Sequence, residues 1–108
     1  MPWLIRGAEV LASLDVAETR SQKRKGLLGK SDYTGVLMLR TRSIHTIGMR
    51  FPIDVAVCDS QGVVLSLKTI PPGRVVAPRF RETVMFEAQA GTLRDLNVKP
   101  GDHLEMRP

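Results

Sequence analysis

The residues best suited to chemistry begin with SIHTIGMRFPIDV, residues 43–55, which contains His45 and, further along, Asp54. Imidazole titrates near neutral pH and binds metals, and a neighbouring carboxylate can orient it for base catalysis or metal binding. A pair formed by His45 and Asp54 across the Pro52 turn is one interpretation. In the other, which we favour, His45 bonds a loop carbonyl and fixes a corner between two strands.

Asp54 and Glu87 are acidic residues within otherwise apolar, alternating segments. Asp54 alternates with Ala56 and Cys58, so we expect a partly buried carboxylate that needs donors or a cation. An ion pair with Arg24 or Arg50 is the favoured interpretation, and a general base or ligand contact is the alternative. Glu87 presents the same choice. The candidate ligand-binding residues are His45, Met49, Arg50, Asp54 and Glu87.

A second candidate site is the loop IPPGRVVAPRFRE, residues 70–82. Its prolines restrict the backbone, so little ordering entropy would be lost if its cations bound an anion or a partner. The anion-binding candidates are Arg74, Arg79 and Arg81, with Phe80 between the last two. The alternative, which we favour slightly, is that Phe80 enters the core and the arginines are solvated.

The sequence offers no pattern typical of a metal site, a cofactor site or a reactive thiol. It contains no HxH, HExxH or CxxC spacing and no glycine-rich loop that opens a helix. Cys58 is the only cysteine and ends an apolar alternating run, which favours a small buried hydrophobe over a nucleophile beside His45. We therefore expect no metal and no cofactor.

Composition bounds the class of protein. The 108 residues are 43% hydrophobic and 25% charged, which is typical of one globular domain spanning residues 1–108. The N-terminus lacks the pattern of a secretory signal, no apolar run is long enough to span a membrane, and the single cysteine fits a reducing compartment, so we expect a cytoplasmic protein. The net charge of +5 is concentrated in residues 20–30 and 74–81. No aromatic residues interleave with the first of these clusters, so we interpret it as a solvated face and expect no nucleic-acid partner.

Alternating apolar residues predict short strands along most of the chain. Residues 53–58 and 63–70 should form an antiparallel hairpin about the loop Asp59-Ser60-Gln61-Gly62, because so short a connection cannot cross over to a parallel neighbour. Thr19-Arg-Ser-Gln22 has the form of a capping box and predicts one short peripheral helix at about residues 19–28. We predict a mainly β fold, namely a small antiparallel jelly-roll-like sandwich or barrel, without parallel βαβ pairing.

An ordered set of short motifs resembles one family over about residues 9–106. The motifs are Ala17-x-Thr19, Arg24-x-Gly26-Leu27-Leu28-Gly29, Gly35-Val36-Leu37, His45-x-x-x-Met49-Arg50-x-x-Pro52-x-Asp54-Val55, Asp59-x-x-Gly62, Glu87-Ala88-x-Ala90-Gly91 and Pro100-Gly101-Asp102. The chain resembles domain of unknown function family 192 of bacteria and archaea. The resemblance implies a mainly β, jelly-roll-like domain with one short helix, and it implies no activity.

The resemblance is imperfect at the segment Ile47-Gly48-Met49-Arg50-Phe51. Many family members have Phe-Trp-Met-Lys-Asn there, so Gly48 replaces an aromatic residue and Phe51 an asparagine. For function we expect a ligand-binding or accessory module with an unidentified small ligand or protein partner, rather than an enzyme. The alternative is a hydrolase-like or metal-assisted enzyme that uses His45 and Asp54.

Overall fold

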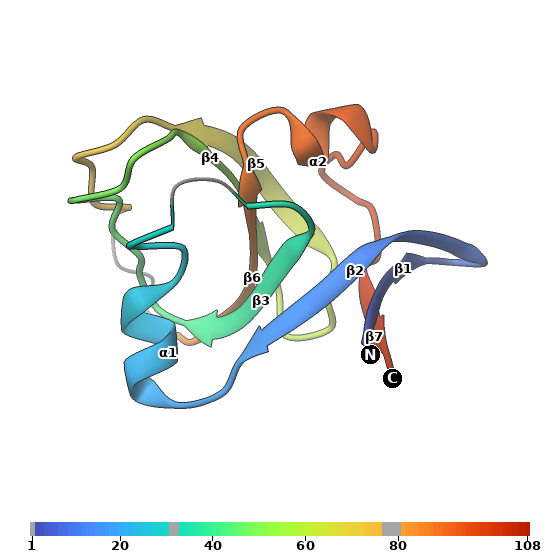
Figure 1. Cartoon of the computed structure of the whole chain (residues 1–108). Coiled ribbons are helices and arrows are strands. Elements are labelled where there is room, and N and C mark those ends of the chain that lie inside the picture. Colours follow the sequence, from blue (N-terminus) through green and yellow to red (C-terminus); the bar gives the residue numbers. More distant parts are fainter. Residues whose placement is uncertain (1, 31–32, 77–80) are drawn as a thin grey trace.

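The strands form one mainly antiparallel sheet, which a computed structural model describes over residues 2–30, 33–76 and 81–108. The elements are β1 (Trp3–Arg6), β2 (Glu9–Ala17), α1 (Arg20–Lys25), β3 (Val36–Thr41), β4 (Ile53–Cys58), β5 (Val64–Ile70), β6 (Thr83–Gln89), α2 (Thr92–Asp95) and β7 (Glu105–Arg107). The strand order is β5-β4-β6-β3-β2-β1-β7, and among the described residues the edge strands β5 and β7 do not pair (Figure 1). The prediction of a mainly β fold with a short helix is confirmed, and the sheet is open.

The predicted hairpin is present as β4 and β5. Asp54 pairs with Thr69 and Val57 with Ser66 in antiparallel register. The connecting loop is held by Asp59. Its Oδ1 accepts hydrogen bonds from the backbone amides of Gln61 at 2.8 Å and Val63 at 3.0 Å. This aspartate side chain supplies the local bonds that let so short a loop reverse the chain.

The pairing of β2 with β3 is parallel, so the expectation of no parallel pair is wrong at this point. Leu14 pairs with Val36, and Ala17 pairs with Leu39, in the same direction. A parallel pair needs a crossover of about a dozen residues or more, usually helical. Residues 18–35, with α1 among them, are long enough for this crossover although few of them are helical.

Apolar side chains pack on both faces of the sheet, and each helix covers a different face. Phe86 belongs to a buried cluster with Leu93 of α2, whereas Met85 belongs to another with Leu27, which follows α1. In Figure 1 the two helices accordingly lie on opposite sides of β6. Because side chains alternate along a strand, Glu87 shares the face of Met85, while Asp54 shares the other face with Ala56.

Helix α1 is capped as predicted but has no buried residue of its own. The Thr19 hydroxyl accepts the Gln22 amide at 3.0 Å, and the Gln22 side chain accepts the Thr19 amide at 3.0 Å. Leu27, just beyond the helix, is buried and attaches the segment to the sheet. Over the described ranges, no helix is long and apolar enough to cross a membrane.

Replacing Thr19 with alanine should lower the free energy of unfolding by about 1 kcal/mol, because the Gln22 amide loses its acceptor. Urea denaturation of the variant and of the parent measures the difference. Ser21→Ala, one position inside the same helix, is the matched control and should change stability by less than half as much. Equal losses in the two variants would contradict a capping role for Thr19.

Candidate functional site

A cavity of about 820 Å³ lies between α1, the end of β3 and the residues that follow it. We call it the α1 cavity. Its cationic lining residues are Arg20, Lys23, Arg24 and Lys25 of α1, Arg40 of β3 and Arg42 after it. Residues three and four apart on a helix lie on one face, which explains why Arg20, Lys23 and Arg24 converge. The charged residues of the lining are thus mainly positive, with Glu82 and Glu87 as its two acids.

Glu87 is the buried acid of the α1 cavity. The residue is only 4% exposed, and it pairs with Leu37 and Val55 on the two neighbouring strands. Burial raises the pKa of this carboxyl to about 7. Among the described residues no donor is hydrogen bonded to it, so the ion pair considered for Glu87 is not found there. Sequence reasoning selected Glu87 but not its surroundings.

Gly26 ends α1 and lets the backbone approach Glu87. Its φ is 50°, in the left-handed region where glycine is favoured. A β carbon at this position would lie 3.1 Å from Oε1 of Glu87. Because Gly26 has no side chain, the Glu87 carboxylate can pack directly against the end of the helix.

His45 lines the same cavity and is exposed. It forms a bridge with Val75, and the loop is fixed beside it by buried Thr46, whose hydroxyl donates to Pro71 O at 2.7 Å. The Thr46 hydroxyl also accepts the Arg74 amide at 2.9 Å. Residues 43–46 therefore form a corner that Thr46 holds. Among the described residues no hydrogen bond joins the His45 ring to a loop carbonyl, which is how we expected His45 to fix this corner. No three His, Cys, Asp or Glu side chains converge in the described part of the chain.

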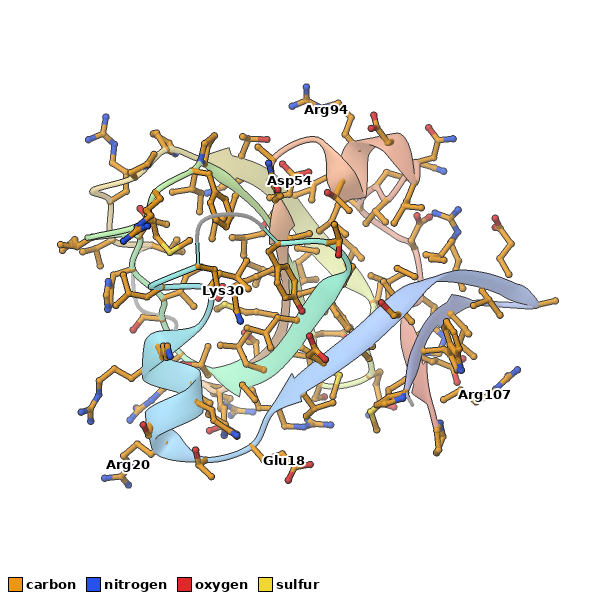
Figure 2. All side chains as sticks on the ribbon, viewed as in Figure 1. Glu18, Arg20, Lys30, Asp54, Arg94 and Arg107 are labelled. Carbon is orange, nitrogen blue, oxygen red and sulfur yellow. The ribbon has the colours of Figure 1, made fainter. Side chains whose placement is uncertain are left out.

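Asp54 does not lie beside His45. It is fully buried on the sheet face opposite to Glu87, and it is not among the residues that line the α1 cavity. Its carboxylate accepts the Thr69 hydroxyl at 2.7 Å and the backbone amides of Gly91 at 2.9 Å and Leu93 at 3.1 Å. Figure 2 shows Asp54 near α2, far from Arg20 on α1. The suggested partners Arg24 and Arg50 are wrong, because backbone amides and a hydroxyl satisfy this carboxylate.

The remaining residues of the 43–55 segment divide between core and surface. Met49 and Phe51 are buried on the α1 side of the sheet, whereas Arg50 is exposed. Neither of the two ligand-binding candidates Met49 and Arg50 lines the α1 cavity. Gly48 has a φ of 84°, and a β carbon there would lie 3.1 Å from Cδ1 of Leu28. Local backbone geometry thus favours glycine at this position in this chain.

The basic loop is described only in part. Arg74 and Arg81 are exposed, whereas Arg79 and Phe80 lie outside the described residues. Neither Arg74 nor Arg81 lines the α1 cavity. Cys58 is fully buried on the Asp54 face of the sheet, and burial raises the pKa of its thiol to about 12. The prediction of a small buried residue is confirmed, and a thiol in this state is not a nucleophile.

A smaller cavity of about 240 Å³ adjoins the first and shares Lys25, Gly26 and Leu27 with it. The Tyr33 hydroxyl donates to Asp15 at 2.5 Å beside it, and burial raises the pKa of Tyr33 above its ordinary range. Sequence reasoning did not select Tyr33, Arg40, Arg42 or Glu82 as site residues. In the sequence they stand out only as charged or polar residues next to apolar strands. Ordinary surface residues show the same pattern.

Comparison with known proteins places the chain in a family. The UPF0127 protein PF1050 of Pyrococcus furiosus is 36% identical over 73 residues, covering 65% of this chain and 63% of that protein. A crystal structure of a protein of unknown function from Novosphingobium aromaticivorans has a TM-score of 0.81 at 17% identity, covering 96% of this chain and 83% of that one. Another, from Sinorhizobium meliloti and provisionally named a transcription regulator, has a TM-score of 0.78 at 22% identity, covering 97% and 91%.

The two solved structures share the fold of this chain. At identities of 17% and 22%, the similarity shows the fold alone. The family described as uncharacterized ACR, or DUF192, has a model that matches residues 4–106, which include every motif noted in the sequence. The chain therefore belongs to the DUF192 family.

Proposed function

We propose that the protein is a cytoplasmic ligand-binding module that takes a small anionic ligand in the α1 cavity. The observation that carries the proposal is the convergence of six Lys and Arg side chains around a cavity in which Glu87 is buried. Cations gathered around a concave space raise the local concentration of anions. Arginine adds a planar fork of donors suited to carboxylate and phosphate groups.

The size and the rim of the cavity support a small molecule. A volume of about 820 Å³ lies within the range that small-molecule sites occupy. Ile47 and Val75 also line the cavity and are 56% and 62% exposed, so they offer apolar contact to the body of a ligand. Ser43 also lines the cavity and adds a neutral hydroxyl, whereas the Thr41 hydroxyl is already bonded to the backbone of Ser43.

Inorganic phosphate should bind in the α1 cavity with a dissociation constant of about a millimolar. Replacing Arg24 and Arg42 together with alanine should weaken it about tenfold, because two cations are lost from one site. NMR titration of the backbone amides around Gly26, at constant ionic strength, measures both affinities.

A control variant loses the same amount of charge elsewhere. Lys68→Ala combined with Arg107→Ala removes two exposed cations that do not line the cavity. Figure 2 shows Arg107 on the far side of the molecule from α1. If the control weakens phosphate binding as much as the Arg24 and Arg42 variant, only net charge matters and the proposed site is wrong.

A further inference from the structure

Glu87 differs from the other buried polar side chains in lacking a hydrogen-bond partner within the described chain. Thr46 donates to Pro71 O, Thr83 donates to Thr41 O, and Asp54 accepts three donors. Glu87 makes no such bond to a described residue, although it is buried to a similar degree. No atom of a described side chain that is fully shielded from solvent lacks a partner, so the Glu87 oxygens open onto the α1 cavity. The Glu87 carboxylate can therefore accept a hydrogen bond from a ligand that enters the α1 cavity.

An ionised carboxylate inside a cationic cavity imposes two demands on a ligand. The cations attract negative charge, whereas the carboxylate repels an anion that has only lone pairs to offer. An anion that carries its own O–H or N–H satisfies both, because it can donate to Glu87 while the arginines and lysines hold its charge. An anion without a donor leaves a buried acceptor unpaired, which costs affinity.

We propose that Glu87 makes the α1 cavity selective for anions that carry a hydrogen-bond donor over equally charged anions that carry none. This inference rests on the proposed anion-binding function and names the class of ligand within it. A protonated oxyanion, or an acid bearing a hydroxyl or amino group, belongs to the favoured class. Sulfate and fully deprotonated phosphate esters belong to the other class.

Selectivity of this kind depends on pH, because burial raises the pKa of Glu87 to about 7. Above that pH the carboxylate can only accept, whereas below it the carboxyl can donate to any anion. Other groups can titrate nearby, so their part must be separated from that of Glu87. They are His45 and Glu82 in the same cavity and Tyr33 and Asp15 in the adjoining one. The lysines and arginines of α1 and β3 also face this space.

The test compares sulfate with inorganic phosphate at about pH 8.5, where both are dianions of similar shape and only phosphate retains an O–H. The parent should bind phosphate about tenfold more tightly than sulfate, because only phosphate can donate to Glu87. In the Glu87→Gln variant the ratio should fall close to one, since the amide can donate to either anion. Glu18→Gln, which removes an exposed acid outside the cavity, should leave the ratio unchanged.

A second measurement uses the parent alone, so the test does not depend on the variant being folded. Sulfate affinity should rise about tenfold as the pH falls from about 8.5 to about 6, while the charge of sulfate stays constant. If Glu87→Gln shows the same rise, a group other than Glu87 is responsible and the inference is wrong. Equal binding of phosphate and sulfate at about pH 8.5 overturns the selectivity but leaves the anion site standing. If neither anion binds, the proposed function itself fails.

Discussion

Replacing Asp54 with alanine should lower the free energy of unfolding by about 3–5 kcal/mol, enough to unfold a marginal domain. The Leu93 amide would lose its acceptor where the bond is buried, and the partly buried bonds from the Thr69 hydroxyl and the Gly91 amide would be lost as well. Leaving a buried donor unpaired costs about 1–3 kcal/mol, and three donors share this carboxylate. Urea denaturation at neutral pH measures the loss.

Two further variants locate the origin of that loss. Asp54→Asn keeps one acceptor oxygen and should lose less than the alanine variant. Asp95→Ala removes an exposed carboxylate from α2 itself and should change stability by less than about 0.5 kcal/mol. If Asp54→Ala unfolded with the same free energy as the parent, the hydrogen bonds from α2 and β5 would contribute nothing to stability, and the structural role assigned to Asp54 would be wrong.

Replacing Glu87 with glutamine should stabilise the protein at high pH by about 3 kcal/mol and have little effect at low pH. The pKa of Glu87 is raised from 4.5 to about 7 in the folded state. A raised carboxyl pKa contributes stability that is fully present below about pH 4.5 and is lost as the pH rises through about 7. Glutamine is neutral at every pH, so it avoids the cost of burying a charge.

Unfolding free energies at several pH values, from about 4.5 to 8.5, measure the difference between this variant and the parent. Only the pH dependence of the difference is diagnostic, because other groups titrate in both proteins. Glu18→Gln, at an exposed position, should show no such dependence. A constant difference across the range would show that Glu87 is not buried as an acid.

Local patterns predicted those parts of the fold that depend on neighbouring residues. The loop after Cys58 is too short for a crossover, so the β4–β5 hairpin followed directly from the sequence. The Thr19 and Gln22 side chains form their capping box within one helical turn. The parallel pairing of β2 with β3 was missed, because it depends on how residues 18–35 return to the sheet and not on any local pattern.

The candidate site was predicted only in part, for a similar reason. His45 and Glu87 were selected from their residue types, and both line the α1 cavity. Asp54 was paired with His45 because of its sequence spacing, although strand alternation sends its side chain to the opposite face of the sheet. The basic residues of α1 were interpreted as a solvated face, because nothing local shows that Arg40 and Arg42 lie across from them.

The absence of buried residues in α1 has a consequence for how the cavity behaves over time. One side of the cavity is built from strands β3 and β6 in the middle of the sheet, whose amides exchange only when the fold opens extensively. The other side is a short helix held by its cap and by Leu27, and such segments open locally at little free-energy cost. A ligand that contacts both sides must order the helix, so its affinity includes the entropy of that ordering. Under the proposed function, residues that never touch the ligand, Thr19 among them, would therefore help to set how tightly it is held.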